Sequence, residues 1–207
     1  MRTFVELAGP AIDHEGKRYL ETRERDAAGA PLYVLTEDAT VVEAARTLGT
    51  GVKRDQKWIL VSITRGTLVA YEGLTPVYAT LISPGRGGVP VPGRDNVEDS
   101  TTPLGTYGIT FKDRASTMSP DTSGGPRRHA IADVPHVQYF KAPFALHAAI
   151  WHERFGEPAS AGCINASPVD AEALFAWTDP EVPAGWQGAR GAGAPGHVKT
   201  TAVVVTR

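Results

Sequence analysis

The chain has 207 residues, which fits one domain with a small appendage and is long enough to bury a core without disulfides. Apolar residues make up 42% and the formal net charge is -2, which argue against intrinsic disorder and against a basic surface for nucleic acid. The single cysteine excludes an internal disulfide and a cysteine-rich zinc finger, and no apolar stretch is long enough to cross a membrane.

The first part of the chain predicts a small β-rich element of unassigned function. Short apolar segments separated by turn residues indicate strands, and residues 41–48 predict a short helix that ends at Gly49. The polar segment 50–55 separates this element from the rest of the chain. The expected domains are therefore residues 1–55 and 56–207.

From residue 58 onward the strand signal is dense. Segments 58–63 and 68–71 predict a β-hairpin whose connection uses the conformational freedom of Gly66. The loop 85–100 is rich in Gly and Pro and long for a compact domain, so it is either functional or mobile. Further strands are expected at residues 77–82, 106–111, 137–140, 145–150 and 198–205.

One helix is predicted after the cysteine. Ser167 suits the N-cap, Pro168 the first helical position and Asp170 the positive first turn. Many strands and one clear helix give a mainly β fold class. The apolar residues of the helix that we expect to face the core are Val169, Leu174 and Phe175.

The residues that can carry chemistry lie between positions 145 and 165. Cys163 follows Gly162 in a turn of small residues, and His147 ends a predicted strand shortly upstream. A thiol attacks as the thiolate, so it needs a nearby base or positive charge, and the bare N–H groups of the turn can face an oxyanion. The residues alone leave two other interpretations open: a buried, apolar cysteine and a hydrogen-bonded core histidine.

This segment resembles the signature of L,D-transpeptidases with the YkuD-type catalytic domain, in which a histidine is followed by Ser/Thr-His-Gly-Cys-x-Asn. Here His147 is followed by Ser-Ala-Gly-Cys-Ile-Asn at 160–165. The resemblance covers roughly residues 56–207 and implies a β-sandwich with one short helix. Three more segments look like family elements: the opening strands at 58–82, the TPxGxY strand at 102–107 and the helix at 167–177.

The resemblance also implies roles for individual residues. Cys163 would be the nucleophile and His147 the general base, oriented by the backbone carbonyl of Ala148. The backbone N–H groups of Gly162 and Cys163 would line the oxyanion hole. Residues at positions of the substrate pocket, or of the turn beside it, are Trp151, Tyr139, Met118, Ser160 and Asn165.

The chain departs from the signature at Ala161, where the family usually has histidine. If that histidine positions substrate or stabilises charge, its loss leaves an enzyme slower by about 10²–10³-fold. If that histidine instead generates the thiolate, we expect this chain to have low catalytic activity or a specialised one. His152 is either a compensating group beside the substrate or an exposed loop residue, and Ala161 leaves room for a different acyl acceptor.

The implied activity is that of a cysteine acyltransferase acting on peptidoglycan stem peptides. Cys163 would form a thioester with a tetrapeptide stem, release D-Ala and pass the acyl group to an amine, without metal or organic cofactor and with carbapenems as inhibitors. Two alternatives stay open: release to water, a D-amino acid or a protein lysine, and a catalytically weak module that binds the cell wall.

Other sites and the location follow from the same residues. A zinc site formed by His147, His152 and Cys163 is disfavoured, because there is neither a second cysteine nor a His-Glu-x-x-His pattern. His136, next to a proline, is expected in a solvated loop. The substrate implies the periplasm or cell wall, and since the N-terminus lacks a secretory signal, we expect one to have been removed.

Overall fold

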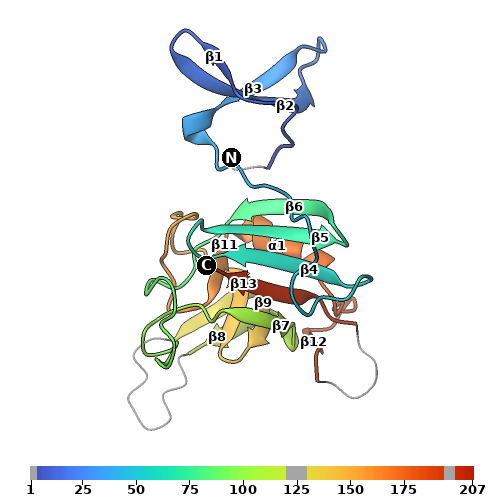
Figure 1. Cartoon of the computed structure of the whole chain (residues 1–207). Coiled ribbons are helices and arrows are strands. Elements are labelled where there is room, and N and C mark those ends of the chain that lie inside the picture. Colours follow the sequence, from blue (N-terminus) through green and yellow to red (C-terminus); the bar gives the residue numbers. More distant parts are fainter. Residues whose placement is uncertain (1–3, 120–129, 194–198) are drawn as a thin grey trace. The chain divides into compact units, whose positions relative to one another are not determined.

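The computed structural model describes residues 4–119, 130–193 and 199–207, and it divides into two compact units, Met1–Ala44 and Ala45–Arg207 (Figure 1). The first unit is an antiparallel sheet in the order β1-β2-β3, followed by a short 3-10 helix. Its expected β-rich character is confirmed. Its elements are β1 (Ile12–His14), β2 (Lys17–Arg25), β3 (Pro31–Leu35) and η1 (Thr36–Asp38).

The helix expected at residues 41–48 is absent from the structure. The segment is short and begins with two adjacent valines, and Val41 is exposed. Helices of this length depend on packing of an apolar face, and β-branched residues lose side-chain freedom in a helix. The segment therefore runs as irregular chain.

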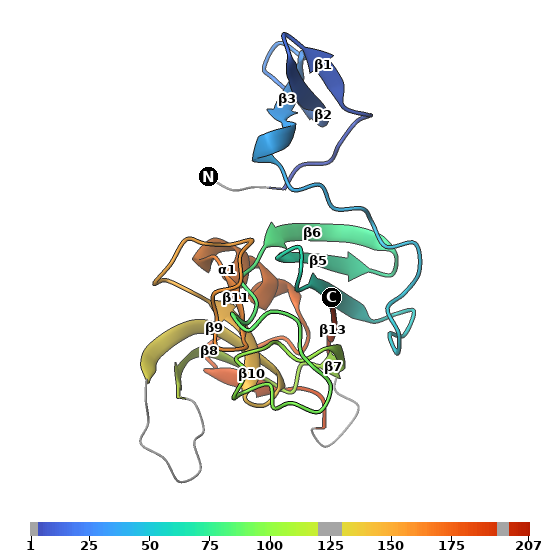
Figure 2. The same ribbon diagram turned by 60° about the vertical axis from the view of Figure 1, so that its left-hand side comes forward.

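In its described residues, the second unit contains two five-stranded sheets and one α-helix (Figures 1 and 2). The first sheet has the order β6-β5-β4-β13-β7 and the second the order β11-β10-β9-β8-β12. The strands of the first sheet are β4 (Lys57–Ser62), β5 (Thr67–Glu72), β6 (Thr75–Leu81), β7 (Gly105–Gly108) and β13 (Ala202–Thr206). The second sheet and the helix comprise β8 (Phe111–Met118), β9 (Ile131–Lys141), β10 (Phe144–Ala148), β11 (Ile164–Ala166), β12 (Gly188–Arg190) and α1 (Pro168–Trp177).

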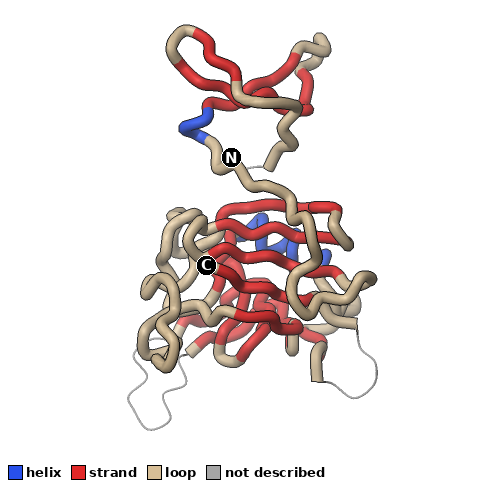
Figure 3. Tube along the Cα trace, viewed as in Figure 1, coloured by secondary structure: helices blue, strands red, loops and turns tan. Residues whose placement is uncertain are grey.

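A single large core lies between the two sheets. Because side chains alternate across a strand, Ile59 and Val61 of β4 point to the same side as each other, as do Leu146 and Ala148 of β10. All four are buried in one cluster, together with residues of β5, β11, β13 and α1. The predicted mainly β sandwich with one short helix is therefore confirmed, and Figure 3 shows far more strand than helix along the trace.

The predicted hairpin is formed by β4 and β5, which pair antiparallel from Lys57↔Glu72 to Ser62↔Thr67. Gly66 in its turn has φ +60, and a Cβ there would lie 2.3 Å from the carbonyl oxygen of Gly156. Three strands have no counterpart among the expected segments: β8, whose charged residues obscure the alternation, and the three-residue strands β11 and β12. The last strand begins at Ala202, and residue 198 of the expected segment lies outside the described residues.

Helix α1 follows its predicted start signals. Ser167 is the N-cap and its Oγ accepts a hydrogen bond from Asp170 N–H at 3.2 Å. Leu174 and Phe175 are buried as expected, but Val169 is 74% exposed. With 3.6 residues per turn, position 169 points away from the face that buries residues 174 and 175, so the expectation for Val169 was wrong.

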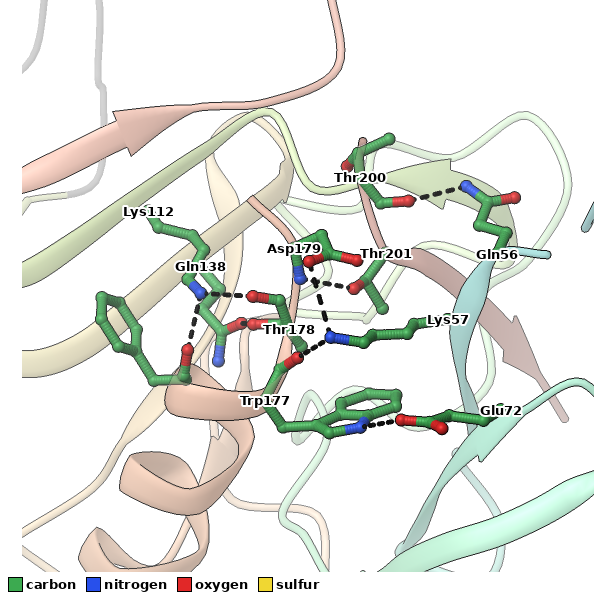
Figure 4. A network of polar contacts seen from close by, with 11 residues as sticks. Gln56, Lys57, Glu72, Lys112, Gln138, Trp177, Thr178, Asp179, Thr200 and Thr201 are labelled. Atoms are coloured by element: carbon green, nitrogen blue, oxygen red, sulfur yellow. Dashed lines mark hydrogen bonds and ion pairs between the residues drawn. The ribbon is translucent and has the colours of Figure 1, made fainter. Parts of the chain in front are cut away.

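Two lysines bind the carbonyl groups at the end of α1 (Figure 4). Lys112 Nζ donates to the carbonyl oxygens of Phe175 at 2.6 Å and Thr178 at 2.8 Å, and Lys57 Nζ donates to that of Trp177 at 2.8 Å. The last carbonyls of a helix have no partner within the helix, so these bonds satisfy them. Lys112 is fully buried, and burial lowers its pKa to about 8.

Candidate active site

The candidate site lies where β10 and β11 run parallel in the second sheet. His147 of β10 stands opposite Asn165 of β11, and Cys163 directly precedes β11. Residues two apart in a strand share a face, so Ala145, His147, Cys163 and Asn165 are on the face of the sheet that points away from the main core. Packing agrees, because Cys163 contacts a small cluster that contains Ala145 rather than the large core.

His147 is held as a neutral base. It is 4% exposed, and its Nδ1 lies 2.9 Å from the carbonyl oxygen of Ala148. Since a carbonyl only accepts, Nδ1 carries the hydrogen and Nε2 is left able to take a proton. Burial, foremost, lowers the pKa of His147 to about 4, with His152 lowering it further against the opposing effect of the Ala148 carbonyl.

Cys163 is half-buried, and its pKa lies on the other side of neutrality. Burial raises the pKa of the thiol to about 11, against a smaller lowering by a hydrogen bond from the Ala145 backbone. The sequence suggested that a nearby base or positive charge would activate the thiol, but no charged group in the described residues lowers the pKa of Cys163. Thiol and imidazole are therefore both neutral at pH 7, and a thiolate requires proton transfer to a base during attack.

The side chains around the sulfur include two of the predicted substrate residues. Met118 of β8 and Tyr139 of β9 pack against the cluster that Val137 and Ala145 form beside Cys163. Between Phe144 and Ala145 the pairing of β10 with β9 shifts register. Such bulges bend a strand and are frequent beside active sites, and this one sits directly before His147.

The turn before Cys163 is fixed by the hydroxyl of Ser160. Ser160 Oγ donates to the carbonyl oxygen of Cys163 at 2.5 Å and accepts from the backbone N–H of Gly162 at 3.0 Å. The expectation that both N–H groups of Gly162 and Cys163 face an oxyanion needs correction, because the N–H of Gly162 is already bonded. The N–H of Cys163 has no acceptor in the described part of the chain.

Gly162 is required by conformation and by space. Its φ is +124, a region that side chains rarely adopt, and a Cβ there would lie 2.5 Å from Cε1 of Phe144 and 3.0 Å from the carbonyl oxygen of Thr101. Ala161, before it, is exposed. The position at which the family signature has histidine thus carries only a methyl group on the outer side of the turn.

Trp151, His152 and Asn165 lie together beside His147. The Trp151 ring is 5.8 Å from that of His147 and the side chain is 43% exposed. His152 Nε2 lies 3.1 Å from Nδ2 of the Asn165 amide, and His152 Nδ1 accepts a hydrogen bond from Arg154 N–H at 3.2 Å. His152 lies in a loop, as one interpretation expected, but it is half-buried rather than exposed.

The roles of the ring nitrogens orient the asparagine amide. Because Nδ1 of His152 accepts a hydrogen bond, Nε2 carries the proton and needs an acceptor. The amide oxygen of Asn165 is buried and has no other partner in the described residues. Turning the amide by 180° exchanges its nitrogen and oxygen, and Nε2–H of His152 then donates to the oxygen.

Sequence reasoning missed the segment that supports the cysteine turn from the other side. Ser83 and Asn165 exchange two backbone hydrogen bonds, of 2.8 and 2.9 Å, and Arg86 N–H donates to the carbonyl of Ser160 at 2.8 Å. The loop that follows is tied back by Gly85 N–H, which donates to Thr102 Oγ1 at 2.9 Å. Only the Pro-Gly pair at 84–85 marks a turn here, and nothing in it points to a distant cysteine.

Within residues 4–119, 130–193 and 199–207, no three His, Cys, Asp or Glu side chains are grouped so that they could hold a metal ion. In the same residues, no helix is both long and apolar enough to span a bilayer. In these residues the site combines a thiol, a neutral imidazole and a backbone N–H without an acceptor beside an exposed aromatic ring, an arrangement that can perform nucleophilic chemistry.

A family model described as the L,D-transpeptidase catalytic domain, YkuD, matches residues 56–205. No curated protein matches the chain. Three similar solved structures are the LD transpeptidase LdtMt1 in complex with imipenem, the C442S mutant of the Enterococcus faecium L,D-transpeptidase, and L,D-transpeptidase 3 from Mycobacterium tuberculosis with a faropenem-derived adduct.

These likenesses support the fold. For LdtMt1 the TM-score is 0.52 at 16% identity, over 92% of this chain and 68% of that one. For the E. faecium protein the TM-score is 0.50 at 18% identity, over 73% of this chain and 50% of that one. For transpeptidase 3 the TM-score is 0.50 at 20% identity, over 73% of this chain and 60% of that one. The chain thus spans from half to about two thirds of these proteins.

Proposed function

This chain belongs to the YkuD family of L,D-transpeptidase catalytic domains, and we propose that it acts on peptidoglycan stem peptides with Cys163 as nucleophile and His147 as general base. One observation carries the proposal: the parallel pairing of β10 with β11 puts both residues on the same face of one sheet. The orientation of His147 by the carbonyl of Ala148 supports it, because Nε2 is then the free base.

The first half-reaction makes a thioester. As the sulfur attacks the carbonyl carbon of the residue before the terminal D-Ala, the thiol proton passes to Nε2 of His147. The tetrahedral intermediate collapses, the C–N bond breaks, and His147 returns the proton to the amine of the departing D-Ala. Both groups begin and end neutral, in agreement with a thiol pKa near 11 and an imidazole pKa near 4.

The second half-reaction transfers the acyl group. An amine, in the proposed reaction the side-chain amine of a second stem, attacks the thioester and loses a proton to His147. The C–S bond breaks, and the sulfur recovers the proton from His147. The product is a cross-link between two stems, and no metal or organic cofactor takes part in these steps.

The surrounding residues have proposed roles that follow from their positions. The N–H of Cys163 is the oxyanion donor, while Gly162 allows the turn to approach and Ser160 holds it. Trp151, exposed beside the base, contacts the stem, with Tyr139 and Met118 on the sulfur side. His152 and Asn165 close the site as a hydrogen-bonded pair.

Ala161 favours a second candidate within the same chemistry. With a methyl group in place of an imidazole, the acyl-enzyme is open to acceptors other than a second stem: water, a D-amino acid or a protein lysine. The remaining alternative is a catalytically weak module that binds the cell wall. For each of these candidates the proposed location is the periplasm or cell wall. The similar structures in complex with imipenem and with a faropenem-derived adduct support carbapenems as acylating inhibitors of this chain.

The test is intact-protein mass spectrometry after incubation with a disaccharide-tetrapeptide, for the wild type and for Cys163→Ala. We expect an adduct that lacks D-Ala on the wild type and none on the variant. Joined stems identify cross-linking, and a trimmed stem identifies hydrolysis. If the protein binds the cell wall but forms no adduct with the stem and is not acylated by imipenem, the enzymatic proposal is wrong and the binding module is favoured.

A further inference from the structure

A second candidate site lies on the opposite face of β8 and β9 from Cys163. Along β9, Val137 and Tyr139 point toward the cysteine, whereas His136 points to the other side of the sheet. There an open cavity of about 250 Å³ lies between β8, β9, α1 and the segment after α1. Its lining includes Arg114, His136, Glu172, Phe175, Glu181 and Val182.

His136 was expected in a solvated loop, but it is half-buried in β9. Its Nδ1 is buried without a hydrogen-bond partner among the described residues, and its φ is +57. A buried nitrogen without a partner costs stability, and a left-handed backbone outside glycine adds strain of a kind that is concentrated at functional sites. Nδ1 itself is shielded from solvent, so the ring meets the open cavity through Nε2, and among the described residues Nδ1 stays unsatisfied.

Arg114 lies across from His136, since the flanking pairs are Asp113↔Val137 and Ala115↔Pro135. Backbone carbonyls fix its guanidinium: Nε donates to Trp186 at 2.7 Å, and Nη2 approaches the carbonyl of Val182 at 3.3 Å. In the described part of the chain these contacts orient the cation, but no carboxylate neutralises it.

The cavity also contains unpaired negative charge. Glu172 of α1 and Glu181 beyond its end line the cavity, and neither is in an ion pair with any described residue. Arg114, Glu172 and Glu181, all three exposed to solvent, thus line one open cavity without forming an ion pair. The apolar surface comes from Phe175 and Val182, both largely buried.

We propose that this cavity binds a free amino acid as its zwitterion. The ligand carboxylate accepts hydrogen bonds from Arg114 and His136, and the ammonium group donates to Glu172 and Glu181. Nε and Nη2 of Arg114 are bonded to backbone carbonyls, which leaves Nη1 to donate to the carboxylate, and charge-assisted bonds are the strongest of their kind. The small volume suits a ligand of this size and excludes a folded partner.

The proposal is independent of the proposed enzymatic function, since none of the cavity residues belongs to the candidate active site. Binding is therefore measured on Cys163→Ala, which removes the nucleophile. Calorimetric titration uses D-alanine and L-alanine as zwitterions, with acetate and ethylamine as probes that carry one charge each. We expect either alanine to bind at least tenfold more tightly than both single-charge probes.

Two variants and one control locate the site. Glu172→Gln and His136→Asn, the latter because asparagine tolerates a positive φ, should each weaken alanine binding about tenfold, the loss of one charged or one buried contact. Glu98→Gln removes an exposed carboxylate elsewhere and should change nothing. Amide NMR shifts on adding alanine should centre on residues 136 and 172.

Three results would overturn the proposal: no alanine binding by a protein that is folded by NMR, equal binding of the single-charge probes, or shifts centred on His147 and Trp151. A peptide terminus presents only one of the two charges, so tight binding of acetate or ethylamine alone would point to that ligand instead. Mass-spectrometric acylation of the wild type is unaffected by any of these outcomes.

Discussion

Asn165 stands opposite His147 in the pairing of β10 with β11, and its side-chain amide lies 3.1 Å from Nε2 of His152. One asparagine thus joins the two histidines of the site. It lies two positions after Cys163, so its backbone also continues the turn that holds the sulfur. The loop that carries Trp151 is thereby tied to the strand of the nucleophile.

We expect His152→Ala to lower kcat about tenfold or more, because it leaves the buried oxygen of Asn165 without a donor, a loss of about 1–3 kcal/mol. His152→Gln, which can still donate, should recover part of the rate. The measurement is acylation by a tetrapeptide stem across pH 5–9, with His14→Ala, an exposed position in the first unit, as control. Equal rates for alanine and glutamine at position 152 would remove the positioning role.

Restoring the signature histidine with Ala161→His should raise turnover, since the position is exposed and can accept a larger side chain. The expected gain reaches about 10²-fold if this group stabilises charge in the transition state. Steady-state rates with a stem substrate and with imipenem give the comparison. An unchanged or lower rate would mean that the chain is adapted to alanine here.

Gly162→Ala should abolish acylation and destabilise the fold. The backbone strain costs about 1–3 kcal/mol, and overpacking against Phe144 costs a similar amount. Gly88→Ala is the matched control, because φ is +74 but nothing lies within 4 Å of its added Cβ. Urea unfolding of both variants separates strain from collision, and equal losses would show that the contact with Phe144 relaxes freely.

The pH dependence of Cys163 has a definite sign. Its pKa is raised from 9.0 to about 11 in the folded chain, so the fold favours the protonated thiol. The resulting stabilisation is present below pH 9 and is lost as pH rises toward 11. Alkylation by iodoacetamide should therefore be slow at pH 7 and still rise above pH 9.

The free energy of unfolding of the wild type should therefore fall between pH 9 and 11, and that of Cys163→Ala should lack this thiol-dependent fall. The comparison isolates the thiol because Lys112 is present in both proteins. The pKa of Lys112 is lowered to about 8, so its contribution to stability increases between pH 8 and 10.5, opposite in sign to that of the thiol. Rapid alkylation at pH 7 with an apparent thiol pKa below 9 would contradict the neutral resting pair.

Lys112→Met should destabilise the chain by about 2 kcal/mol, although it removes a buried amine. The reason is that the carbonyls of Phe175 and Thr178 at the end of α1 lose their donor (Figure 4). Lys53→Met, at an exposed position, serves as the control in urea unfolding. A neutral or stabilising effect would show that water or backbone movement satisfies both carbonyls.

The sequence by itself determined the class of fold and the residues of the candidate chemistry. The hairpin around Gly66 and the start of α1 at Ser167 follow from local turn and capping rules, which act over a few residues. The signature from His147 to Asn165 identified the family. These patterns can be recognised in the sequence because the interactions that cause them, such as a cap or a turn, join residues that are close in the chain.

Tertiary structure decided what distant segments do to one another. Only the fold shows that Ser160 occupies the N–H of Gly162, that His152 meets Asn165, and that burial sets the thiol pKa high. It also moved His136 from an expected loop into a strand beside an open cavity. Hydrogen-bond partners and desolvation depend on which residues pack together across the two sheets, and this packing is not encoded in the spacing of any one segment.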